Sequence, residues 1–97
     1  RFSTDCVEEL MEDEDPIVRL NAALLLALWG KEQRVIPHLE KAYPEANRWQ
    51  KIQILDAIGA VGAHNSKTFL LNALSESSQM LRLVSASALI RCLRNGS

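Results

Sequence analysis

Residues 15–30, DPIVRLNAALLLALWG, decide the fold. Asp15 is a good helix cap, and Pro16 follows it at the first helical position, where a missing amide costs nothing. The remainder of the stretch is apolar on nearly every side, so the helix cannot face water and needs neighbours around it. In a chain of 97 residues, we expect those neighbours to be other helices of the same kind.

The composition predicts one all-α domain with an aliphatic core. The hydrophobic fraction is 47%, but the aromatic fraction is only 5%, so Leu, Ile, Val and Ala must supply the core. The alternation typical of strands is almost absent. No run of 18 apolar residues occurs, so we expect no membrane span. Because the chain starts at Arg1 within an apparent helix start, we expect a fragment of a longer protein.

Charge and cysteines add two expectations. Residues 1–15 carry one basic and seven acidic side chains, a balance of −6, whereas residues 16–97 have a balance of +5. The acidic run is interpreted as a solvated helix end, with an acidic docking patch as the alternative. Cys6 and Cys92 lie on apolar helix positions at opposite ends of the chain, which favours two buried thiols in a reducing, cytoplasmic compartment over a disulfide.

Capping residues and apolar spacing predict six helices in three consecutive pairs. Ser3, Asp15, Asn47 and either Asn65 or Ser66 are the expected caps, and Gly30 and Gly62 are the expected ends of the second and fourth helices. The predicted helices span residues 4–12, 16–29, 33–43, 47–61, 66–74 and about 78–95.

The helix pairs repeat one pattern, with copies expected at about residues 3–30, 33–62 and 66–95. A shift of 32 residues, and then of 31, superposes the basic residues Arg19, Lys51 and Arg82. An acidic residue stands six places before each of them: Asp13, Glu45 and Glu76. We expect the acids in the turns and the bases in the first turn of each second helix, so that stacked repeats form a ladder of ion pairs.

At these residues the chain resembles the HEAT family in its short form, as found in phycobilin lyases. The resemblance covers essentially all of the chain, although in the third copy Leu93 replaces the closing glycine. It implies an α-solenoid, a right-handed superhelix of three antiparallel helix pairs, whose second helices line the concave side. The exposed inner column would then be drawn from Asn21, Leu24, Leu28, Lys31, Gln53, Asp56, Ala60, Ser87, Arg91 and Arg94.

The residues for catalysis or metal binding are not arranged in a recognisable motif. His38 and His64 lie 26 residues apart, and neither has Cys or His within four residues, so they are expected on a helix surface and in a turn. Gly59 and Gly62 indicate tight packing and a helix end. Trp29 is expected in the core, and Trp49 partly buried between adjacent repeats.

These observations favour a non-catalytic scaffold or adaptor that binds a protein or peptide, without cofactor or metal. Two alternatives remain. One is nucleic-acid binding, as in HEAT-like DNA glycosylases, through Lys51, Arg82, Arg91 and Arg94, although the whole chain is not basic. The other is a bilin-lyase-related protein, by resemblance alone. Because the ends of the stack differ in charge, head-to-tail self-association is also an expectation.

Overall fold

The computed structural model describes residues 5–30, 33–62 and 66–95, and these contain helices but no strand. The helices are α1 (Asp5–Leu10), α2 (Pro16–Gly30), α3 (Ile36–Ala42), α4 (Arg48–Val61), α5 (Lys67–Ala73) and α6 (Gln79–Asn95). Two 3-10 helices, η1 (Gln33–Val35) and η2 (Tyr43–Glu45), flank α3. The all-α prediction is therefore confirmed. The expectations for Ser3, Lys31, His64 and Asn65 lie outside the described residues.

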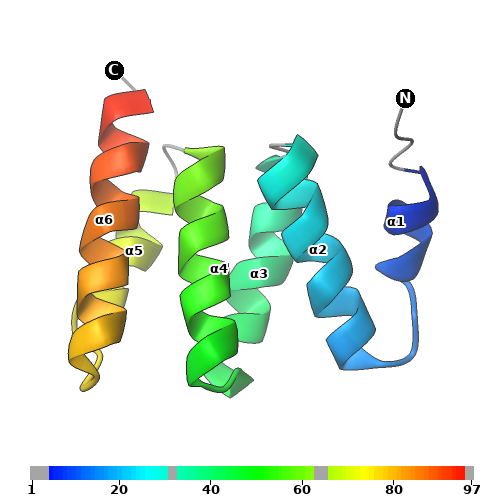
Figure 1. Cartoon of the computed structure of the whole chain (residues 1–97), viewed down its shortest axis with the longest axis horizontal. Helices are drawn as coiled ribbons and strands as arrows, with labels where there is room; N and C mark the ends of the chain where they lie inside the picture. Colours follow the sequence, from blue (N-terminus) through cyan, green and yellow to red (C-terminus); the bar gives the residue numbers. More distant parts are fainter. Residues whose placement is uncertain (1–4, 31–32, 63–65, 96–97) are drawn as a thin grey trace.

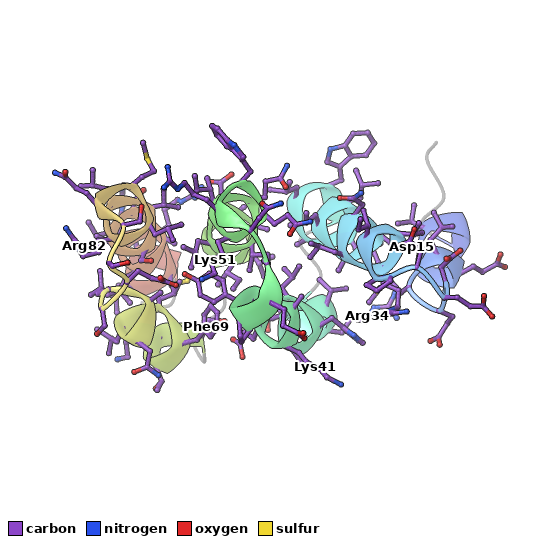
Figure 2. The ribbon with its side chains drawn as sticks, turned by 90° about the horizontal axis from the view of Figure 1, so that it is seen from below. Asp15, Arg34, Lys41, Lys51, Phe69 and Arg82 are labelled. Carbon is purple, nitrogen blue, oxygen red and sulfur yellow. The ribbon has the colours of Figure 1, made fainter. Side chains whose placement is uncertain are left out.

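The helices form two layers. α2, α4 and α6 lie side by side in one layer, with α3 and α5 behind them and α1 at the N-terminal end beside α2 (Figure 1). Seen from the edge that carries the turns within the pairs, the two rows are distinct (Figure 2). α4 packs against α2 on one side and α6 on the other. The molecule measures 34 × 30 × 18 Å.

The three long helices begin at equivalent capping residues. The Asp15 side chain accepts a hydrogen bond from the amide of Ile17 at 2.9 Å. Asn47 accepts from Gln50 at 2.9 Å, and its own amide donates to the Gln50 side chain at 3.0 Å, which completes a capping box. Ser78 accepts a longer bond, 3.4 Å, from Leu81. α4 ends at Gly62, whose φ of 71° favours glycine.

The third predicted helix is not one α-helix over residues 33–43. It divides into η1, α3 and η2, and a proline lies near the start of each of the last two. Pro44 has no amide to donate to the carbonyl of Glu40, so the α-helical pattern cannot continue past Ala42. α1 is also shorter than predicted, because the amides of Glu12 and Asp13 bond three residues back in tighter turns.

The core runs between the two layers and is aliphatic. Its most buried large side chains are Leu26, Leu39, Ile54, Leu55, Ile58 and Leu70. α4 and α6 approach so closely that a Cβ added at Gly59 would lie 2.9 Å from both Cα and Cβ of Ala88. The interpretation of Gly59 as a packing glycine is consistent with this contact, because no larger residue fits there without a shift of the backbone.

Both tryptophan predictions are wrong. Trp29 is 68% exposed and Trp49 is 75% exposed. Trp29 shares a column with Cys92, which is buried against α4; in α2 the same column faces the N-terminal end of the molecule, where only the short α1 lies. Trp49 is the second residue of α4 and lies on the side away from the second layer, so no adjacent helix covers it.

Candidate functional site

Two arginines fix the turns within the first and third helix pairs in the same way. Arg19 donates from Nη1 to the carbonyls of Asp13 and Glu14, at 2.7 and 3.1 Å. Arg82 donates from Nη1 to the carbonyls six and five residues before it, at 2.8 and 3.0 Å. The turn carbonyls after α1 and α5, which have no helical partner, are thereby satisfied.

The expected ladder of ion pairs has one rung among the described residues. Lys51 Nζ lies 3.2 Å from Glu76 Oε2, and this pair joins the second helix pair to the third. Arg19 and Arg82 donate to backbone oxygens instead, because a guanidinium can span both turn carbonyls. Asp13 is also used locally, since its side chain accepts from the amide of Asp15 at 2.8 Å. The ladder prediction was therefore wrong for the other two bases.

The Lys51–Glu76 pair belongs to a larger tyrosine cluster, formed by Tyr43, Lys51, Phe69 and Glu76. The Tyr43 hydroxyl donates to Glu76 Oε2 at 2.7 Å, and its ring meets Phe69 edge-on at 5.2 Å. Lys51 Nζ lies 5.0 Å from the Tyr43 ring centroid. Figure 2 looks onto this cluster, with Lys51 in one layer and Phe69 in the other.

Hydrogen bonding and burial shift two pKa values in the tyrosine cluster. The pKa of Glu76 is lowered, first by the hydrogen bond from Tyr43 and then by the bond and charge of Lys51, with burial opposing them. The pKa of Tyr43 is raised above its usual 10.0, first by burial and then by the adjacent carboxylate. Tyr43 therefore remains a hydrogen-bond donor and Glu76 an ionised acceptor at neutral pH.

A hollow of about 600 Å³ opens one helix pair earlier, between α2, the end of α3 and the start of α4. Its walls include apolar side chains from Met11 and Leu20, and its polar rim includes Arg19, His38 and Glu45. This volume lies within the range of about 300–1,000 Å³ that is usual for ligand sites. The sequence-based reasoning did not identify the hollow, since no single motif marks it.

The predicted inner column lies largely on the outer face of the α2–α4–α6 layer. Its exposed members are Asn21, Leu28, Gln53, Asp56, Ser87 and Arg94. Leu24 is only 5% exposed, so its inclusion was wrong. It follows Leu20 by one helical turn, and both side chains belong to the core. Ala60 is partly buried, and Lys31 lies outside the described residues.

One ion pair connects two members of this column across neighbouring helices. Arg91 Nη2 on α6 lies 2.6 Å from Asp56 Oδ1 on α4 and donates to the Asp56 carbonyl at 3.3 Å. The two side chains are 39% and 56% exposed, so the pair is solvated and its net contribution to stability is small, about 0–1 kcal/mol. Its main effect is to offset one of the arginine charges on this face.

The family model for HEAT repeats matches residues 4–90. The chain belongs to the HEAT repeat family. No curated protein matches the chain at the threshold of the search.

In this HEAT repeat chain, the equivalent positions in the first turns of α2, α4 and α6 form an exposed apolar column. Ile17, Trp49 and Met80 are 58%, 75% and 53% exposed. The sequence shifts had already placed these three residues at one position of the repeat. Their exposure was missed, because the spacing of apolar residues alone does not show which side of a helix is covered.

Within the described parts of the HEAT repeat chain, no group of three or more His, Cys, Asp or Glu residues is arranged to hold a metal ion. His38 is exposed on α3, as predicted. Cys92 is a buried free thiol whose Sγ lies 3.8 Å from the Ile58 carbonyl, and burial raises its pKa. The side chain of Cys6 lies outside the described part. None of the described helices is long and apolar enough to cross a membrane.

Proposed function

We propose that this chain is a non-catalytic scaffold or adaptor module that binds a protein or peptide. We further propose that its helix pairs form a right-handed α-solenoid with repeats at about residues 3–30, 33–62 and 66–95. Membership of the HEAT family supports the general role, because repeats of this kind present extended surfaces to macromolecular partners. A cytoplasmic location, suggested by unpaired cysteines, remains a prediction.

The apolar column of Ile17, Trp49 and Met80 is the observation that carries this proposal. These three side chains occupy equivalent positions on three neighbouring helices, and each is more than half exposed. Exposed apolar groups in a regular row favour contact with another macromolecule. Polar side chains follow one turn later, including Asn21 and Gln53, and would supply hydrogen bonds at the rim of the interface.

The polar part of the proposed surface consists of Asn21, Leu28, Gln53, Asp56, Ser87, Arg91 and Arg94, without the buried Leu24. A peptide lying across the three helices would contact the apolar column with its large side chains and this mixed surface with its polar groups. The spacing of the contacts would follow the spacing of the helices, which is a general property of repeat proteins.

Peptide display against the folded, immobilised chain tests the proposal. Selected peptides should bind in solution, and Trp49→Ala should weaken them at least about tenfold, as expected of an aromatic hot spot. Lys67→Ala, an exposed position on α5 in the other layer, is the matched control and should leave affinity unchanged. Failure to select any peptide, or binding that is indifferent to both Trp49→Ala and Met80→Ala, would contradict it.

The geometry favours neither alternative function. Of the basic residues expected to contact nucleic acid, Lys51 is paired with Glu76, Arg91 is paired with Asp56, and Arg82 donates to turn carbonyls. A nucleic-acid surface needs cations directed at phosphates, and these three are directed at the protein itself. Bilin-lyase chemistry has no observation in its favour beyond the family resemblance.

A further inference from the structure

The hollow and the tyrosine cluster occupy the same place in successive helix pairs. A shift of 32 residues for Tyr43 and Lys51, and of 31 for Phe69 and Glu76, leads to Met11, Arg19, His38 and Glu45. All four of these residues line the hollow. The hollow is therefore the counterpart, between the first two helix pairs, of a packed cluster between the last two.

Two substitutions explain why one place is packed and the other is open. Met11 stands where Tyr43 stands, and it has neither a ring nor a hydroxyl. Ala23, which lines the hollow, stands where the fully buried Leu55 stands. The loss of a phenol ring and of part of a leucine side chain leaves space that the neighbouring helices do not fill.

The polar groups that hold Tyr43 in the tyrosine cluster are matched in kind around the hollow. Glu45 offers an exposed carboxylate, as Glu76 does to the Tyr43 hydroxyl. His38 offers an aromatic ring in place of Phe69. Arg19 offers a cation in place of Lys51, and its bonds to the Asp13 and Glu14 carbonyls hold it at the rim.

We infer that the hollow binds the phenol side chain of a tyrosine from a partner peptide. The ring occupies the space beside Met11 and Ala23, with its edge toward His38 and its face toward Arg19. The hydroxyl donates to the Glu45 carboxylate, which repeats the bond from Tyr43 to Glu76. The inference rests on the proposed peptide-binding function and deepens it, because it specifies an anchoring residue away from the apolar column.

Titration with N-acetyl-tyrosinamide, followed by NMR of methyl-labelled methionine, tests the inference directly. Met11 and Met80 are the two methionines, and Met80 lies on α6, so it is an internal control. The Met11 methyl resonance should shift with half-saturation near about 1 mM, while that of Met80 stays in place. N-acetyl-phenylalaninamide, which lacks the hydroxyl, should bind about three- to tenfold more weakly.

Three variants separate the contacts. Glu45→Ala should reduce the affinity for the tyrosine probe to that for the phenylalanine probe, whereas Glu12→Ala, an exposed carboxylate outside the hollow, should have no effect. Met11→Tyr should fill the hollow from within and abolish binding, as followed by the His38 ring protons.

Equal affinity for the two probes, or shifts of Met80 that match those of Met11, would overturn the inference. In that event, display-selected peptides that depend on Trp49 would still support the proposed function. Conversely, loss of that function in the display experiment would leave a positive Met11 titration standing as a site for a phenol.

Discussion

At the residue scale, Tyr43 and Glu76 connect packing to charge. The hydrogen bond from Tyr43 is the largest cause of the lowered pKa of Glu76, and the bond and charge of Lys51 lower it further. A carboxyl whose pKa is lower in the folded than in the unfolded chain binds protons more readily when unfolded. It therefore stabilises the fold above its ordinary pKa, and this contribution is lost as the pH falls through the folded value.

The first prediction concerns this pH dependence. The free energy of unfolding of the wild-type chain should fall as the pH is lowered from about 5 through the folded pKa of Glu76, which lies below 4.5. Glu76→Gln should remove this part of the slope, and urea unfolding at several pH values measures it. Taking the difference between the two proteins cancels other acids, such as Glu40, whose pKa burial raises. Parallel pH profiles for the two proteins would exclude this role.

The second prediction concerns the close contact of Gly59 with Ala88. Gly59→Ala should gain about 1 kcal/mol of helix propensity and lose about 1–3 kcal/mol by overpacking, for a net destabilisation of about 1 kcal/mol. The added methyl would meet backbone as well as side-chain atoms of α6, so the helices must move apart. Ser87→Ala, at an exposed helical position, is the control and should change stability little. A stabilised Gly59→Ala variant in thermal unfolding would show that the helices separate easily.

The sequence-based errors at this scale have a common cause. The positions of Ile17, Trp49 and Met80 in the repeat were found correctly, but the burial predicted for Trp49 was not. Apolar spacing identifies a stripe on a helix, whereas burial depends on which neighbour reaches that stripe. Leu24 shows the opposite error, because its neighbours in the column are polar in the later copies and it is buried in the first.

At the scale of the element, the caps explain why the helix boundaries could be predicted closely. Asp15, Asn47 and Ser78 all accept hydrogen bonds from the first turn that follows them. Capping is a local interaction, so the sequence carries most of the information needed to locate it. The division of residues 33–45 into η1, α3 and η2 depends on how Pro37 and Pro44 are accommodated, which simple periodicity does not describe.

The third prediction compares two of these caps. Asn47→Ala should destabilise the chain by about 1 kcal/mol, because it removes both the side-chain acceptor and the partner of the Gln50 capping box. Ser78→Ala should cost less, about 0.5 kcal/mol, because its bond to Leu81 is long at 3.4 Å. Urea unfolding of both variants measures the order, and a larger loss for Ser78→Ala would refute this account.

At the scale of the whole molecule, the two ends of the layer differ in chemistry. The N-terminal end carries exposed Glu9, Glu12 and Glu14 near α1. α6 lies at the opposite end and exposes Leu83, Ile90 and Leu93, together with Arg82. Opposite charges attract, and an unlike-faced contact of this kind does not close on itself, so it would extend head to tail.

The fourth prediction follows from this asymmetry. The mass from light scattering should rise with protein concentration at about 0.01 M salt and fall back toward the monomer at about 1 M salt, because salt shortens the range of charge attraction. Ile90→Glu should prevent the association without unfolding the chain, since that side chain is 55% exposed. A constant monomer mass at both salt levels would rule it out.

The family and the all-helical class could be predicted from the repeated pattern of residues, and the tyrosine cluster and the hollow could not. Each of those features depends on side chains from two helix pairs, and the ladder of ion pairs was an incomplete guide to how they meet. Comparing equivalent positions between copies would have shown that Met11 replaces Tyr43, and that is the one sequence signal for the hollow.

The contact between Gly59 and Ala88 also has a mechanical consequence. α4 and α6 touch through backbone atoms, so they move as one stiff unit. The hollow beside Met11 leaves the junction of α2 with α3 and α4 more compliant. Bending of the whole chain is then concentrated at that junction, and whatever fills the hollow sets the curvature that the α2–α4–α6 surface presents.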